Sequence, residues 1–227
     1  MKIPKYIPEV KSVLKSRIIA VPDAIYQCSG IKILGTRIKS LLFTSDVAII
    51  KNNNAHSIIA VYPFTPQLSI IHSILEVASV PVFPGVGGGI TSGHRSVQIA
   101  LQAELMGAYG VVVNAPTKVE VIKELKANLD IPIISTIASL DDDYMSKIRA
   151  GVSILNISGG VHTPDMVAKI RKDVGSEFPL IATGGPNNES ILRTIEAGAN
   201  SITYTPPTSA EIFEEIMIDY REQKESL

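Results

Sequence analysis

The sequence has no tryptophan and only one cysteine, Cys28, and aromatic residues make up just 5% of its 227 positions. So few aromatics argue against a stacking surface for bases or sugars. A single cysteine excludes an internal disulfide and suits a reducing compartment, so we expect a cytoplasmic protein. The formal net charge of -1 offers no basic surface for nucleic acid or an anionic membrane, and we expect neither partner.

Long hydrophobic runs are also missing. None approaches the roughly 20 residues that span a bilayer, and the start, Met1–Lys5, lacks the apolar region of a signal peptide. The hydrophobic content of 45% is nevertheless ample for a buried core. Because no linker or low-complexity tract interrupts the chain, we expect one domain over residues 1–227, with an extension at 1–39 and the main fold at 40–227.

Short apolar runs alternate with helix-period segments from Ser40 onward. Near-continuous apolar runs are typical of strands that are buried on both faces of a parallel sheet. Strands are predicted at 40–45, 57–62, 80–83, 110–113, 131–136, 152–156, 180–182 and 201–204. Helices are predicted at 47–50, 67–78, 95–106, 117–129, 141–150, 163–174, around 191–195, and at 210–222. Eight strand–helix units favour a single (β/α)₈ TIM barrel over a doubly wound open sheet, which stays as the alternative.

The extension is predicted to contain a helix and a hairpin. Val10, Val13 and Leu14 have helical spacing, which indicates a short helix within residues 4–14. Two β-like runs, residues 17–21 and 31–34, are predicted to pair as a β-hairpin that closes one end of the barrel. If residues 17–21 were instead the first barrel strand, Asp23 would lie at the barrel mouth.

The site of such a barrel lies at the carboxyl ends of the strands. Neutral polar residues dominate these ends and are candidates for ligand binding, with the two asparagines as candidate catalytic groups: Tyr62, Asn114, Thr136, Asn156, Ser158 and Gly159. Neutral donors can orient a ligand or stabilise an oxyanion, but alone they cannot transfer protons at ordinary pH. Asp46 is the carboxylate directly at a strand end. It is a candidate base, and a helix N-cap is its favoured alternative.

A glycine-rich loop, Gly85–Gly89, follows the third predicted strand. Gly87, Gly88 and Gly89 either adopt conformations that other residues avoid or let a ligand approach the backbone. Arg95 follows and is a candidate for pairing with a phosphate or carboxylate, unless it is simply a solvated helix-start residue. His94 is a candidate general acid or base, although a plain surface histidine is the favoured alternative.

A second glycine pair, Gly184–Gly185, follows the seventh predicted strand after Thr183. Glycine backbones can approach an anion closely, and the start of the last helix, Thr208–Ser209, is expected to offer free N–H groups. With Thr205, these residues predict a phosphate cradle. Two observations weaken it: Pro206 and Pro207 lack N–H donors, and the glycines can serve helix–strand packing alone.

Residues 181–185 (IATGG) and 196–202 (EAGANSI) resemble the phosphate-binding TIM barrels, a superfamily that includes ribulose-phosphate epimerases and FMN-dependent oxidoreductases. The resemblance implies a small phosphorylated metabolite and isomerase, lyase or aldolase chemistry. The alternatives are an FMN-dependent oxidoreductase, which would use FMN as cofactor, and a non-catalytic phosphate-ligand sensor. The whole chain also resembles bacterial proteins that sometimes carry a general hydrolase label, although no nucleophile elbow, triad order or metal set supports that label.

No metal is expected, since the run Asp141–Asp143 is explained by helix capping and no other spacing suggests ligands. Homo-oligomerisation is left open by the sequence.

Overall fold

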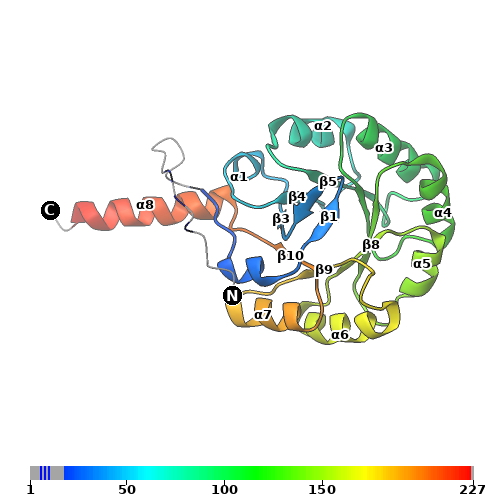
Figure 1. Ribbon diagram of the computed structural model, residues 1–227. Coiled ribbons are helices and arrows are strands. Elements are labelled where there is room, and N and C mark those ends of the chain that lie inside the picture. Colours follow the sequence, from blue (N-terminus) through cyan, green and yellow to red (C-terminus); the bar gives the residue numbers. More distant parts are fainter. Residues whose placement is uncertain (1–5, 7, 9, 11–17, 226–227) are drawn as a thin grey trace.

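The computed structural model describes residues 6, 8, 10 and 18–225. Its parallel strands close into a barrel in the order β10-β3-β4-β5-β6-β7-β8-β9, with helices around them (Figure 1). The strands are β3 (Ser40–Phe43), β4 (Ser57–Ala60), β5 (Val82–Gly87), β6 (Val111–Val113), β7 (Ile133–Ile137), β8 (Ile154–Ile157), β9 (Leu180–Thr183) and β10 (Ser201–Tyr204). The predicted TIM barrel is confirmed. The alternative prediction of a doubly wound open sheet is wrong, because the last strand, β10, pairs with the first barrel strand, β3, and closes the sheet.

The helices follow the strands as predicted, within a few residues at each end. They are α1 (Val47–Lys51), α2 (Leu68–Val77), α3 (His94–Leu105), α4 (Val119–Asn128), α5 (Tyr144–Ala150), α6 (Thr163–Val174), α7 (Asn188–Glu196) and α8 (Ser209–Glu225), with a short 3-10 turn, η3 (Gly160–His162), before α6. Unlike the others, α8 projects away from the ring (Figure 1). No helix within residues 18–225 is both long and apolar enough to cross a membrane.

The N-terminal hairpin exists, and the run predicted at 31–34 is one of its strands, but its partner strand differs from the prediction. Its strands are β1 (Ile31–Ile33) and β2 (Thr36–Ile38). Of the run predicted at 17–21, the described residues 18–21 do not form a hairpin strand: Ile19 instead forms an isolated parallel bridge with Asn53. The two-residue loop Leu34–Gly35, in which Gly35 has a φ of 84°, joins β1 directly to β2. The helix predicted within residues 4–14 lies outside the described residues.

A 3-10 turn, η2 (Asp23–Gln27), covers the side of the barrel between α7 and α1. It packs against α7, and Val21 just before it donates its N–H to Asn54 Oδ1 at 2.8 Å. Lys39 Nζ, from the residue before β3, donates to the Tyr26 carbonyl of η2. Asp23 therefore lies toward the amino ends of the strands, and the alternative that put it at the barrel mouth is wrong.

The hairpin closes the amino end of the barrel, as predicted. Ile31, Ile33 and Ile38 are buried in a cluster with the side chains that point into the barrel: Leu41, Ile59, Phe83, Val112, Ile134, Ile154 and Ile181. β10 contributes a polar anchor instead, since Ser201 Oγ donates to the Ile38 carbonyl at 2.7 Å. The barrel interior at the amino ends of the strands is thus filled by side chains.

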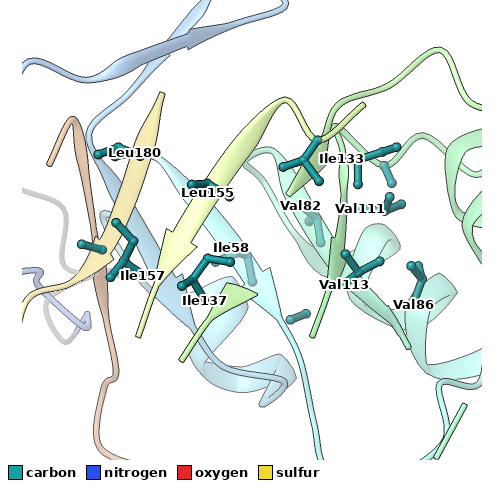
Figure 2. Packing of buried hydrophobic residues seen from close by; sticks show 14 of the residues in the cluster. Ile58, Val82, Val86, Val111, Val113, Ile133, Ile137, Leu155, Ile157 and Leu180 are labelled. Atoms are coloured by element: carbon teal, nitrogen blue, oxygen red, sulfur yellow. The ribbon is translucent and has the colours of Figure 1, made fainter. Parts of the chain in front are cut away.

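A second, larger core separates the strands from the helices. Side chains of the alternate strand positions point outward into it, among them Val82, Val111, Ile133, Leu155 and Leu180 (Figure 2). Because both faces of most barrel strands are buried, these strands read as continuous apolar runs.

Ile38→Ala tests the role of the hairpin. Ile38 is 1% exposed, so truncation leaves a cavity under the barrel and should lower the free energy of unfolding by about 2–5 kcal/mol. Leu34→Ala is the control, because Leu34 lies on the turn with 68% of its surface exposed and should change stability by less than about 0.5 kcal/mol. Equal values for the two variants in urea unfolding would show that the hairpin does not contribute to the core.

Candidate functional site

A cavity of about 220 Å³, called the central cavity below, opens at the carboxyl ends of the strands. Its polar lining comes from five neighbouring strand ends, β6 to β10: Asn114, Thr136, Asn156, Ser158, Thr183, Thr203 and Thr205. Its apolar lining comes from β3 and β4: Phe43, Ile59 and Val61. The volume is below the roughly 300–1,000 Å³ of pockets for drug-sized ligands, so it suits a small metabolite.

The two-residue period of the strands explains this lining. Ile154 lies in the lower interior cluster, so Asn156 and Ser158, two and four residues further on, point into the mouth. The same step leads from Ile181 to Thr183. The sequence-based prediction found Asn114, Thr136, Asn156, Ser158, Thr183 and Thr205 but missed Thr203 and the apolar residues Phe43, Ile59 and Val61. Applying the same period to β10 would have found Thr203, since it lies two residues before Thr205.

The polar lining residues of the central cavity, from Asn114 to Thr205, are called the ring below. Their hydrogen bonds determine which of their atoms can donate to a ligand or accept from it. Thr183 Oγ1 donates to the Ile157 carbonyl at 3.1 Å and therefore presents acceptor lone pairs. Thr136 Oγ1 accepts from Asn156 Nδ2 at 3.3 Å, which leaves the hydroxyl proton of Thr136 available. Thr203 Oγ1 is buried and has no partner among the described residues. The ring thus presents donors and acceptors together without a formal charge.

A side pocket adjoins the central cavity and shares Val61 and Asn114 with it. It lies between the loop after β4 and the glycine-rich segment, and it carries two exposed apolar side chains, Phe64 and Ile90. Tyr62 lines it, as predicted for a mouth residue. The Tyr62 hydroxyl accepts the Gln67 N–H at 2.9 Å, so its own proton is available to a ligand.

Of the three glycines predicted to bind a ligand in the segment Gly85–Gly89, packing requires two to be glycine, Gly87 and Gly88. β5 runs to Gly87, so the segment begins as strand rather than as a loop. Gly87 and Gly88 have φ of 133° and 109°, and a Cβ on Gly88 would lie 2.0 Å from Thr117 Oγ1. A Cβ on Gly89 would meet nothing within 4 Å. Gly87 and Gly89 line the side pocket, whereas Gly88 packs against the turn that follows Asn114.

Packing also explains the second glycine pair. A Cβ on Gly184 would lie 2.7 Å from Ile202 and 2.8 Å from Ile191, so this glycine allows α7 to pack closely on the strands. The Gly184 N–H donates to the Thr203 carbonyl at 3.2 Å and is not free for an anion. Gly185 has a φ of 81°, a conformation that favours glycine at this turn.

The start of α8 does not offer the free N–H groups that were predicted. The Thr208 N–H donates to Glu211 Oε2 at 2.7 Å, and the Ser209 N–H donates to Asp46 Oδ2 at 3.3 Å. Two carboxylates of the protein therefore occupy the position expected for a phosphate. That prediction rested on the free N–H groups and the dipole expected at a helix start, and it did not take into account the side chains that cap this one.

Asp46 acts as a cap on two helices. Its Oδ1 accepts the N–H groups of Ala48 and Ile49, at 2.9 and 3.2 Å, while Oδ2 faces Ser209. Partial burial raises the pKa of Asp46, but the hydrogen bonds from Ser209, Ile49 and Ala48 outweigh burial and lower it. The N-cap alternative is confirmed, and Asp46 lies outside the lining of the central cavity.

His94 and Arg95 are also outside the two cavities at the mouth. His94 is the first residue of α3, and its Nδ1 lies 2.6 Å from Glu124 Oε1 of α4. Arg95 lines a shallow surface groove beside Leu68 of α2. The Gly159 N–H donates to Thr163 Oγ1 at 3.0 Å, and a Cβ on Gly159 would overlap Met166, so this glycine supports α6 rather than the cavity.

Lys147 is a buried cation that the sequence-based prediction overlooked. Its side chain, on α5, donates from Nζ to the Ala115 carbonyl at 2.6 Å, and burial lowers its pKa although Asp142 and Asp143 raise it. Because Ala115 follows Asn114, this contact helps to fix the strand end that carries the asparagine.

No protein-family model matches the chain, and no curated protein matches it. Solved structures show the same fold. Phosphonopyruvate hydrolase in complex with oxalate and Mg²⁺ has a TM-score of 0.62 at 14% identity, covering 83% of each chain. 2,3-Dimethylmalate lyase, a PEP mutase/isocitrate lyase superfamily member, has a TM-score of 0.62 at 12% identity, covering 89% of this chain and 85% of the other. The 4-hydroxy-tetrahydrodipicolinate synthase of Methylacidiphilum fumariolicum SolV has a TM-score of 0.57 at 14% identity, covering 72% of this chain and 67% of the other.

The residues at the mouth do not fit Mg²⁺, which occurs in one of these structures. Mg²⁺ is usually held by one or two carboxylates together with waters or phosphates, whereas the central cavity is lined by neutral oxygens. Asp46 and Glu211 direct carboxylate oxygens at backbone N–H groups instead. Within the described ranges, no three His, Cys, Asp or Glu side chains gather into a possible metal site.

Few backbone N–H groups remain for the phosphate of FMN. In a phosphate-binding barrel, the cofactor phosphate would lie against the backbone after β9 and β10. Gly184, Thr208 and Ser209 have already used their N–H groups there, and Pro206 and Pro207 have none.

Thr203→Val tests whether the hydroxyl in the central cavity is unsatisfied. Valine keeps the shape and removes a buried polar atom without a partner, so the free energy of unfolding of the ligand-free protein should rise by about 1 kcal/mol. Ser201→Ala is the matched control on the same strand. Ser201 is buried and hydrogen-bonded to Ile38, so its loss should lower stability by about 1–2 kcal/mol. Destabilisation by both changes in urea unfolding would mean that Thr203 has a partner after all.

Asp46→Ala tests the capping role. The free energy of unfolding at pH 7 should fall by about 1–2 kcal/mol, because two helices lose hydrogen bonds. Since the folded pKa is lowered, this contribution is present above the unfolded pKa of about 4 and disappears as the pH falls through the folded pKa. Urea unfolding should therefore show the two proteins converging in acid. A constant difference down to pH 2 would contradict the role of the charge.

Proposed function

We propose that the chain is a small-metabolite enzyme of the lyase or aldolase type, with its substrate in the central cavity. The ring of neutral polar side chains carries this proposal, because it gathers at the mouth of the barrel around a buried hydroxyl that lacks a partner among the described residues. A bound substrate would supply that partner. The fold supports the proposal by analogy, since a lyase and a phosphomutase share it, but the proposal is argued from the site and not from the fold.

The ring suits a reaction in which an oxygen atom gains negative charge, as in carbon–carbon cleavage to an enolate. Asn114 and Asn156 would donate to this oxygen through their amide groups, and Thr136 would add its hydroxyl proton. The Asn156 amide is oriented for this role by its bond to Thr136 and by its place on a rigid strand. Donors that are fixed before the reaction need no rearrangement as charge develops.

The proposed proton donor is Tyr62. The side chains that line the central cavity are Asn, Ser, Thr and apolar residues, none of which exchanges protons readily at neutral pH. Tyr62 lies in the adjoining side pocket and has an available phenolic proton. In a carbon–carbon cleavage it would protonate the enolate carbon left by the broken bond. The phenolate so formed would accept the proton that the substrate hydroxyl loses as it becomes a carbonyl, so that protons balance over the reaction.

A non-catalytic ligand sensor is the second candidate. It is favoured by the same absence of ionisable groups from the lining of the central cavity. A compound that binds in the central cavity but is not converted would favour the sensor over the enzyme.

The test is turnover by NMR of a panel of small oxo- and hydroxy-compounds, with and without a phosphate group, including pyruvate, phosphoenolpyruvate and 2,3-dimethylmalate. Asn156→Leu should lower turnover of any substrate by about 10²–10³-fold, the effect of removing one oxyanion donor. The control is Asn128→Leu, because the Asn128 amide bonds only its own helix, at the Glu124 carbonyl. Turnover that survives Asn156→Leu, or falls equally in the control, would place the reaction elsewhere.

Binding should also be independent of pH from about 6 to 8 for a ligand that does not titrate there. The lining of the central cavity has no group that changes charge in this range. Calorimetric titrations across the range check this. A bell-shaped or stepped dependence would show that an ionisable group of the protein takes part in binding.

A further inference from the structure

A groove of about 630 Å³ runs from the central cavity across the end of β10 to the start of α8. Thr183, Thr203 and Thr205 line both the central cavity and this groove, so one ligand can extend from one into the other. At its far end the groove is lined by Glu211 and Glu215, one helical turn apart on α8.

The groove is negatively charged through Glu211 and Glu215, whereas a phosphate site needs positive charge or free N–H groups. Pro206 and Pro207 lie in its wall and have carbonyl groups but no N–H donors. The N–H groups of Thr208 and Ser209 point at carboxylates of the protein. The N–H and hydroxyl of Thr208 lower the pKa of Glu211, which therefore keeps its negative charge at neutral pH.

A second observation points to a ligand in the same place. Thr203 is 5% exposed, lines the groove, and its Oγ1 has no hydrogen-bond partner among the described residues. A buried hydroxyl of this kind costs stability unless another group meets it. The acidic end of the groove and the unsatisfied hydroxyl lie along the same path from the central cavity.

We propose that this groove binds a cationic group, so that the substrate of the proposed enzyme is an amine-bearing hydroxy- or oxo-compound rather than a phosphate ester. This proposal rests on the proposed function for the oxygen-bearing end of the ligand, which lies in the central cavity. The ammonium group lies between the carboxylates of Glu211 and Glu215, and the hydroxyl of Thr203 donates to the oxygen atom of the ligand.

The test uses matched probes with the full-length protein: 5-amino-1-pentanol, 1,5-pentanediol and inorganic phosphate, with affinity measured by NMR titration. The amino alcohol should bind more tightly than the diol, and its affinity alone should fall as sodium chloride is raised, because salt screens the exposed charges. Phosphate should not bind. Phosphate binding, or equal affinity for the amino alcohol and the diol, overturns the proposal.

Glu215→Gln should lower the affinity for the amino alcohol by about two- to fivefold, the range for an accessible ion pair, and leave the affinity for the diol unchanged. Glu214→Gln is the control, because it removes the same charge from the same helix outside the groove lining. An equal effect of both variants would mean a general field rather than a subsite, and no effect of either overturns the proposal.

Asn156→Leu separates the two proposals. Suppose that the diol binds, that Asn156→Leu abolishes its binding, and that Glu215→Gln changes neither affinity. The central cavity is then supported as the ligand site, and the proposal of a cationic subsite is wrong. If Asn156→Leu leaves the binding of both probes unchanged, the proposal that the central cavity binds the substrate is wrong.

Discussion

Closure of the barrel is the constraint on which the rest of the structure depends. Once β10 pairs with β3, every second side chain of each strand must point into a shared interior. The lower positions are apolar and are completed by the hairpin, which leaves no space at the amino end. The upper positions are amides and hydroxyls from β6 to β10, and they leave a small cavity. The same alternation therefore produces both the core and the candidate site.

The backbone after β9 and β10 shows how local chemistry can redirect a common fold. Helix starts and glycine turns at this place suit anions. Here the carboxylates of Asp46 and Glu211 take up those N–H groups, and the prolines remove others. Asp46 joins α1 to the start of α8 in this way, so it contributes to stability rather than to ligand binding. What remains for a ligand is a set of neutral side chains beside an acidic groove.

The sequence predicted the barrel because its signals are local and repeated. Eight apolar runs separated by helix-period segments leave few alternatives, and the boundaries of α6 and β10 were predicted to the residue. The strand ends followed from the fold, and with them most of the ring. The hairpin was misplaced because the apolar run at 17–21 is a bridge partner rather than a strand, which only its tertiary contacts reveal. The prediction of a free N–H group at Ser209 failed for a related reason, since Asp46, which accepts it, is distant in sequence. Glu211, which accepts the Thr208 N–H, lies only three residues away, so this local cap could have been predicted.

The most direct test of the account is a single NMR titration of the full-length protein with its tightest-binding compound, because one spectrum reports both backbone and asparagine side-chain amides. The account predicts saturable shifts of the side-chain amides of Asn114 and Asn156, while the backbone amides of Gly184 and Ser209 keep their positions. Shifts of those backbone amides with unmoved asparagine signals would show that the ligand displaces the carboxylates of the protein and binds at the rim, and would contradict the account.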